Sequence, residues 1–83
     1  MELETQSLNQ QPLAVCPPTI QKGAKGANVK LLQEKLNGYG FDTKIDSIFG
    51  DSTVKSVKLF QSHYGLKDDG IVGPSTWRKL QVC

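Results

Sequence analysis

The sequence has few of the residues that catalytic and metal sites require. Its 83 residues include one histidine, His63, and two cysteines, Cys16 and Cys83, which are not in a CxxC spacing. One histidine without a serine or cysteine signature gives no nucleophile and base pair, and a second histidine that could complete a zinc site is missing. The acidic residues around Asp69 do not follow the ligand spacing of an EF-hand loop. We therefore expect no enzyme activity, no metal site and no cofactor.

Long apolar runs and concentrated charge are also missing. The longest apolar run is far shorter than the ~20 residues that span a bilayer, and no basic segment followed by an apolar stretch marks a signal peptide. Residues 19–83 hold ten basic and six acidic residues, but the lysines are spread along the chain. Nucleic-acid binding typically requires a concentrated basic face. We expect no membrane partner, no nucleic-acid partner and a monomer.

Composition divides the chain into two parts. Residues 1–18 are rich in Gln, Asn and Pro, and we expect a flexible tail or linker there, whereas residues 19–83 form the folded domain. Cys16 and Cys83 flank the second part, and we hypothesise that they form a disulfide. Such a bond would stabilise a small domain by roughly 4 kcal/mol in the chain-entropy model and would fit an oxidising compartment. Two unrelated thiols are the alternative.

Three helices are predicted from apolar residues that recur every three or four positions. The first follows Asn28, a plausible N-cap, and ends at Gly38 or Gly40. The second covers residues 51–64, and its first three residues supply capping oxygens. The third covers residues 74–81 and begins with Pro74, which suits a first helical turn. The expected core positions are Val29, Leu32, Leu36, Tyr39, Val54, Val57, Phe60, Tyr64, Trp77 and Leu80, with Leu59 beside those of the second helix.

One loop sequence occurs twice. "DSIFGDST" (residues 46–53) and "DGIVGPST" (residues 69–76) are identical at five of eight positions. The aspartate of each copy can accept hydrogen bonds from nearby backbone amides, and the glycine permits an unusual backbone angle before a helix. We expect the isoleucine of each copy to point inward. We also expect a short bridge between Ile48 and Ile71, with the two loops side by side.

The motifs taken in order resemble a known family. "VKLLQEKLNGYGF", "DSIFGDSTVKSVKLFQSHYGL" and "DDGIVGPSTWRKL" are similar to the peptidoglycan-binding domain family over about residues 20–80. The resemblance implies an all-α fold, a compact three-helix bundle with two repeated Asp-x-Ile-x-Gly loops. It also implies non-catalytic binding of bacterial cell-wall peptidoglycan, at its glycan or stem peptide, which targets an attached or partner wall hydrolase. The location would be extracytoplasmic.

One position departs from the family pattern. The first loop has Asp46-Ser47 where the family usually has Asp-Gly. If this position requires a positive φ, the serine costs of order 1 kcal/mol. The first loop would then be slightly reshaped.

Five polar residues are candidates for ligand contact. Gln61 and Tyr64 lie one helical turn apart and could line a shallow groove, where an amide and a phenol suit a sugar or peptide. Asp46, Ser52 and Asp69 could contact a saccharide hydroxyl or a stem-peptide amine. The alternatives are aspartates that only satisfy backbone donors, an ordinary surface glutamine and a tyrosine at the edge of the core.

Two further readings concern function. A catalytic pair of Asp46 and Asp69 is disfavoured, because matching positions of a repeat have equivalent roles whereas an acid and a base need different environments. The main alternative to wall binding is a protein-interaction or structural module without wall affinity. Binding to insoluble peptidoglycan would separate these two functions.

Overall fold

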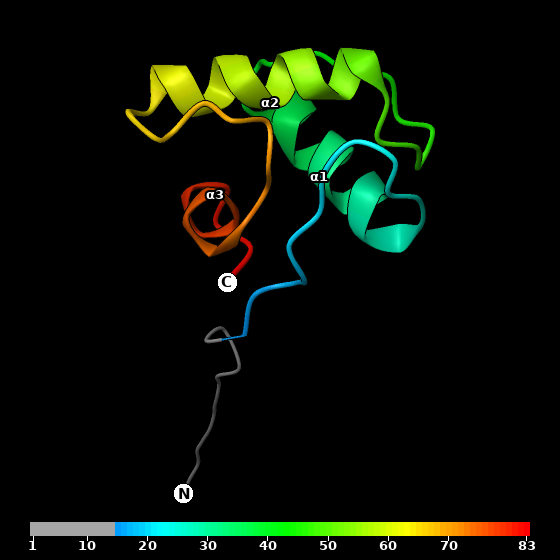
Figure 1. Cartoon of the computed structure of the whole chain (residues 1–83), viewed down its shortest axis with the longest axis horizontal. Coiled ribbons are helices and arrows are strands. Elements are labelled where there is room, and N and C mark those ends of the chain that lie inside the picture. Colours follow the sequence, from blue (N-terminus) through cyan, green and yellow to red (C-terminus); the bar gives the residue numbers. More distant parts are fainter. Residues whose placement is uncertain (1–14) are drawn as a thin grey trace, which may run out of the picture.

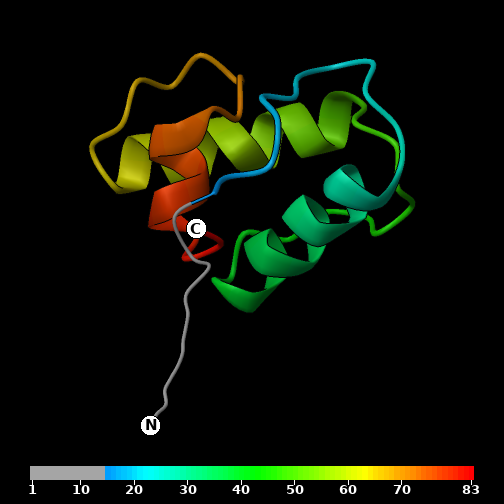
Figure 2. The same cartoon turned by 90° about the horizontal axis from the view of Figure 1, so that it is seen from below.

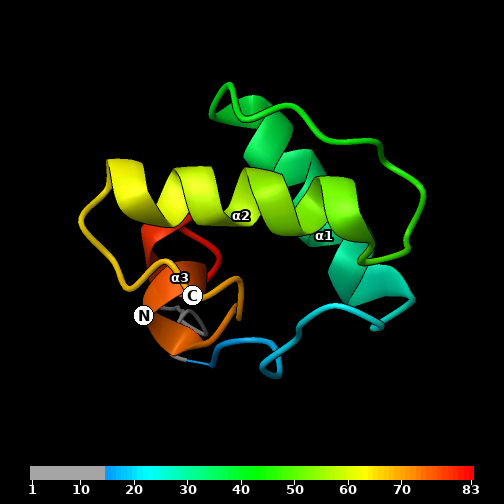
Figure 3. The ribbon, with the colours of Figure 1, turned by 45° about the horizontal axis from the view of Figure 1, so that its top comes forward.

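The structure, a computed structural model, describes residues 15–83. They form three helices, α1 (Ala27–Gly38), α2 (Asp51–His63) and α3 (Pro74–Lys79). The part of the chain that is described contains two isolated β-bridges and no named strand. The longest helix, α2, lies across α1, and α3 packs beneath the other end of α2 (Figures 1 and 3). The predicted all-α three-helix fold is confirmed.

The helices begin differently from the prediction. The preceding residues are Gly26, Gly50 and Gly73, and no side chain caps any of the three helices. The caps expected from Asn28, Asp51, Ser52 and Thr53 are therefore wrong. The Asp51 carboxylate instead lies 2.6 Å from Lys22 Nζ, and the Thr53 hydroxyl lies 3.1 Å from Gln33 Nε2. Pro74 occupies the first turn of α3, as predicted.

The core combines residues from the helices with one residue from each repeated loop. Seven of the ten predicted core positions are buried, whereas Tyr39, Val54 and Tyr64 are half-buried at its edge. Leu59, which was expected beside them, is 54% exposed, so that expectation is wrong. Burial of such side chains contributes about 1.5–3 kcal/mol each and is the main source of stability. The buried apolar residues are Val29, Leu32, Leu36, Phe49, Val57, Phe60, Val72, Trp77 and Leu80.

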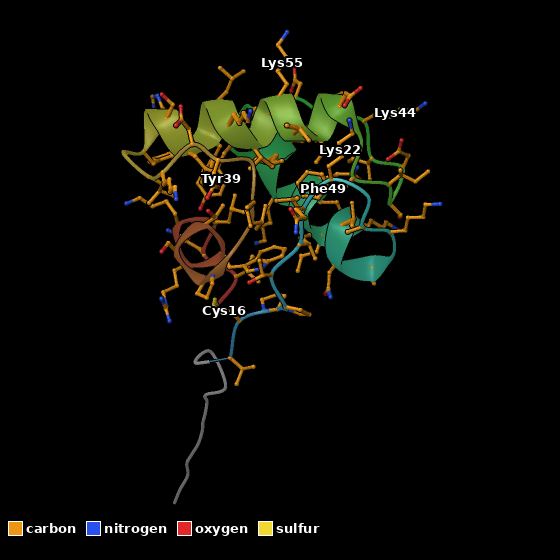
Figure 4. The ribbon with its side chains drawn as sticks, viewed as in Figure 1. Cys16, Lys22, Tyr39, Lys44, Phe49 and Lys55 are labelled. Carbon is orange, nitrogen blue, oxygen red and sulfur yellow. A yellow bond between two sulfur atoms is a disulfide. The ribbon has the colours of Figure 1, made fainter. Side chains whose placement is uncertain are left out.

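The inward-pointing residue of each loop is not the isoleucine. Ile48 and Ile71 are 47% and 38% exposed, whereas Phe49 and Val72, the residues after them, are buried. Figure 4 shows Phe49 among the side chains beside α1. In extended backbone, neighbouring side chains point to opposite sides, so burial of the second residue turns the first outward. The expectation of an inward isoleucine is therefore wrong.

An N-terminal strap, which we define as residues 16–26, lies between the repeated loops. Bridges join Ile20 to Val72 and Lys25 to Ile48. The Ile20 N–H donates to the Val72 carbonyl (3.1 Å), and the Phe49 N–H donates to the Ala24 carbonyl (2.9 Å). Figure 2 shows the strap passing α3 on its way to the start of α1. The predicted bridge between Ile48 and Ile71 is wrong, because each loop pairs with the strap.

The strap is fixed at its first residues. Cys16 and Cys83 form a disulfide with a Cα–Cα distance of 4.9 Å, so the predicted pairing is confirmed. The Trp77 indole N–H donates to the Pro18 carbonyl at 3.1 Å. Both contacts involve residues that the sequence assigned to the tail. Residues 1–14 lie outside the described residues, so the boundary at residue 18 stays a prediction.

Candidate functional site

Gln33, a buried residue of α1, holds the first loop in place. Its Oε1 accepts hydrogen bonds from the backbone N–H groups of Asp46 (3.0 Å) and Ser47 (2.9 Å). Its Nε2 lies 2.9 Å from the Ile48 carbonyl, 3.0 Å from Asp46 Oδ1 and 3.1 Å from Thr53 Oγ1. A buried amide must be hydrogen-bonded to avoid a large desolvation cost. This side chain therefore fixes the loop to the helix before it and to the helix after it.

Gln61, a buried residue of α2, holds the second loop in the same way. Its Oε1 accepts a hydrogen bond from the Gly70 N–H at 3.0 Å. Its Nε2 lies 2.9 Å from the Ile71 carbonyl, 3.1 Å from Thr76 Oγ1 and 3.4 Å from Asp69 Oδ1. The internal duplication therefore includes a buried glutamine as well as a loop. Sequence reasoning assigned Gln61 to a groove and gave Gln33 no role.

The two repeated aspartates form equivalent turns. Asp46 Oδ1 accepts from the Ile48 N–H at 3.0 Å, and Asp69 Oδ1 accepts from the Ile71 N–H at 2.9 Å. The Ile48 N–H, followed by the Gln33 amide, holds the pKa of Asp46 below its ordinary value of 3.8. Both carboxylates satisfy backbone donors, and both side chains are exposed. Their contact with a ligand stays a prediction.

The first loop is more tightly closed than the second. The amide of Gln33 lies 3.0 Å from Asp46 Oδ1, whereas the matching distance from Gln61 to Asp69 is 3.4 Å. In the first repeat, the hydroxyl of Thr43 lies 3.1 Å from that of Thr53. The position equivalent to Thr43 in the second repeat is Leu66, which cannot make this bond.

The positive φ expected for the first loop is present. Ser47 has a φ of 64°, and Gly70, its equivalent, has a φ of 76°. Both residues are in the left-handed region, which favours glycine. At this position the first loop therefore keeps the left-handed φ of the second, at some cost in conformational energy.

A hollow of about 400 Å³ lies beside the second loop. Its walls are the end of α2, the second loop and the start of α3. The lining comes from Gln61, residues 65–67, Asp69, Ile71 and residues 73–76. The site thus brings together two of the five predicted ligand residues, Gln61 and Asp69, and adds Lys67 and Ser75.

The other three predicted ligand residues lie elsewhere. Asp46 is in the first loop and Ser52 is in the first turn of α2. Tyr64 is half-buried in an aromatic cluster, and the centroid of its ring lies 4.7 Å from that of Phe60 and 6.2 Å from that of Tyr39. Lys79 Nζ lies 5.6 Å from the centroid of the Tyr64 ring. Tyr64 is not in the lining of the hollow. Their contact with a ligand stays a prediction.

No group of three His, Cys, Asp or Glu side chains in residues 15–83 could hold a metal ion. None of the helices described is long and apolar enough to cross a bilayer.

Comparison with known proteins relates the chain to one family and to segments of larger enzymes. A family described as "Putative peptidoglycan binding domain" matches residues 25–80. Over 65 residues the chain is 43% identical to the zinc D-Ala-D-Ala carboxypeptidase of Streptomyces albus G, covering 75% of this chain and 26% of that enzyme. Over 67 residues it is 45% identical to the spore cortex-lytic enzyme of Bacillus subtilis (strain 168), covering 77% of this chain and 21% of that enzyme.

A solved structure agrees with this relationship. The SleB N-terminal domain matches with a TM-score of 0.74 and 39% identity, over 76% of this chain and 88% of that domain. The chain therefore spans about a quarter of the length of the two enzymes. It spans most of the SleB N-terminal domain.

Proposed function

The chain belongs to the peptidoglycan-binding domain family, and from that premise we propose that it binds bacterial cell-wall peptidoglycan through the hollow beside the second loop. The observation that carries this proposal is the hydrogen bonding of Gln61, which fixes both the loop and the start of α3. Because these lining residues of the hollow are already ordered, they lose little conformational entropy when a ligand binds.

The lining offers the chemistry that a glycopeptide needs. Asp69 and Ser75 supply a carboxylate and a hydroxyl for directional hydrogen bonds, and the exposed side chain of Ile71 supplies an apolar contact. Gln61 is 1% exposed, so its proposed role is to position the loop. A few convergent polar groups in a mainly apolar hollow are typical of ligand sites.

The biological role that we propose is targeting. A small site binds weakly, but it raises the local concentration of any catalytic domain to which it is attached or bound. The two related enzymes are named a zinc D-Ala-D-Ala carboxypeptidase and a spore cortex-lytic enzyme, and the matched segment is a minor part of each. We place the chain outside the cytoplasm, where its disulfide is stable.

Sedimentation with purified insoluble peptidoglycan tests this function. We expect the folded wild-type protein to pellet with the wall material and Asp69→Asn to stay largely in the supernatant. Asp68→Asn is the matched control, because it removes a neighbouring carboxylate that does not line the hollow. Wild-type protein that stays in the supernatant at low salt, with its fold verified, would contradict wall binding and would favour a protein-interaction module.

A further inference from the structure

We propose that the hollow recognises the stem peptide of peptidoglycan and not its glycan, through a peptide that carries both an ammonium group and a carboxylate. This inference rests on the function proposed above and specifies its ligand. It derives from the opposite charges of Lys67 and Asp69, which line the same hollow.

The two charges are available to a ligand. Both side chains are exposed, and the ion pair found within residues 15–83 joins Lys22 to Asp51 instead. Lys67 and Asp69 are two positions apart in the chain, so their Cα atoms are at most about 7 Å apart. A ligand with a positive and a negative group a few bonds apart would satisfy both side chains at once.

The aspartate is oriented before a ligand arrives. Its Oδ1 accepts from the Ile71 N–H at 2.9 Å, and the more distant Gln61 amide lies 3.4 Å away. An ionised carboxylate has about four lone-pair sites, so acceptor capacity remains for a ligand ammonium. A charge-assisted hydrogen bond of this type is about twice as strong as a neutral one.

The apolar part of the lining also suits a peptide. Ile71 and Leu66 border the hollow beside the two charged residues, and they can cover the aliphatic carbons of an amino-acid side chain. The described residues of the lining include no aromatic ring on which a sugar face could stack. Tyr64, which is near in sequence, packs against Phe60 instead. A glycan without ionised groups could hydrogen-bond to these two side chains through its hydroxyls, but it would neutralise neither charge.

The first repeat provides an internal comparison. Lys44 and Asp46 are the equivalents of Lys67 and Asp69, but Gln33 binds the Asp46 carboxylate at the shorter distance of 3.0 Å. Leu66, which borders the hollow of the second repeat, is replaced by Thr43 at the equivalent sequence position of the first repeat. Lys44→Gln is therefore a matched control for Lys67→Gln, because it removes the same charge from an equivalent position in the other loop.

The test measures affinity by NMR titration with defined soluble probes. These are a complete muropeptide, its stem peptide alone, its disaccharide alone, and the stem peptide with its amine acetylated or its carboxylates amidated. We expect the muropeptide and the free stem peptide to bind with similar affinity, and the disaccharide not to bind. Each neutralised peptide should bind roughly tenfold more weakly, the usual effect of losing one charged hydrogen bond.

Variants assign this effect to the hollow. Asp69→Asn and Lys67→Gln should each lose about tenfold in affinity for the stem peptide, whereas Asp68→Asn and Lys44→Gln should bind like the wild type. The asparagine can still accept from the Ile71 N–H, so the loop should remain folded. Should Asp69→Asn fail to fold, Lys67→Gln, which changes an exposed side chain, carries the test.

Failure of the inference can be told from failure of the function. Equal binding of neutral and charged peptides, or binding of the disaccharide as tightly as the muropeptide, would overturn the stem-peptide proposal and leave wall binding intact. No binding of any soluble probe, together with no sedimentation on insoluble peptidoglycan, would overturn both.

Discussion

Gln33 of α1 and Gln61 of α2 occupy equivalent places in two copies of one structural unit. The side-chain oxygen of each glutamine accepts a hydrogen bond from a backbone N–H of the loop that follows its helix. The side-chain nitrogen lies close to an aspartate and a backbone carbonyl of that loop and to a threonine hydroxyl of the next helix. The unit is therefore a helix, a loop and a helix start joined by one side chain. The hollow in which we propose that ligand binds lies beside the loop of the second copy.

Removal of either amide should destabilise the protein strongly. We expect Gln33→Leu and Gln61→Leu each to lower the free energy of unfolding by about 2–4 kcal/mol, because backbone groups buried with the amide lose their partners. Gln21→Leu, at an exposed position of the strap, should change it by less than about 0.5 kcal/mol. Urea unfolding followed by circular dichroism measures these values. Losses below about 1 kcal/mol at both buried sites would contradict the assigned role.

The residues with positive φ should respond in opposite directions. Ser47→Gly should raise the free energy of unfolding by up to about 1 kcal/mol, since glycine has no steric cost at a φ of 64°. Gly70→Ser should lower it by about 1 kcal/mol, and a new Cβ there would also lie 3.3 Å from Lys58 Cε. Thermal unfolding of both variants checks the prediction. A stabilised Gly70→Ser would show that φ is not the controlling factor.

The disulfide should account for a large part of the stability. Cys16 and Cys83 are separated by 67 positions, and closing a loop of that length contributes about 4 kcal/mol in the chain-entropy model. We expect the Cys16→Ser, Cys83→Ser double variant to unfold at a much lower urea concentration than the oxidised wild type. Reduced wild type should match the variant. Equal midpoints for the oxidised and reduced protein would refute a stabilising cross-link.

Acid should weaken the fold through the first loop. Hydrogen bonds from the Ile48 N–H and the Gln33 amide lower the pKa of Asp46 below 3.8 in the folded state. A carboxyl whose pKa is lower in the folded state than in the unfolded state stabilises the fold at pH values above its unfolded-state pKa. This stability is lost as the pH falls through the folded-state pKa. The Lys22 ammonium lowers the pKa of Asp51 in the same direction.

Asp46→Asn separates these two contributions. We expect it to be less stable than the wild type near neutral pH and to lose less stability on acidification to about pH 3. Asp51→Asn, which removes an exposed ion pair, should have a smaller effect at neutral pH. Urea unfolding at both pH values gives the comparison. Parallel curves for Asp46→Asn and the wild type would contradict the assigned hydrogen bonds.

Periodic and repeated features of the sequence predicted most of the fold. The apolar spacing of Val29, Leu32 and Leu36 gave α1, and the recurring loop sequence gave the duplication. The two cysteines at the borders of the folded region gave the disulfide. These signals are local or are carried by a single pair of residues.

The inner residues of the loops could not be predicted in this way. A short loop has no helical or strand period, so its sequence does not say whether Ile48 or Phe49 is buried. That choice depends on the strap, which binds each loop through backbone hydrogen bonds that side-chain patterns do not encode.

The role of the buried glutamines in holding the loops was missed for a related reason. Glutamine is usually exposed, and the spacing to the bound aspartate is 13 residues for Gln33 but 8 for Gln61. A search at one fixed offset therefore does not align them. The signal that could have identified both residues is their place in the apolar stripe of each helix, since Gln33 lies four residues after Val29 and Gln61 lies four residues after Val57.

The most direct test of the central claim is a map of backbone amide shifts on titration of the ¹⁵N-labelled protein with a soluble muropeptide. The account predicts shifts concentrated in residues 65–76 and at Gln61, with the first loop, including Asp46 and Ser52, and Tyr64 changing less. Shifts centred on the first loop or on the outer face of α1, with the second loop unchanged, would contradict the assignment of the hollow as the binding site.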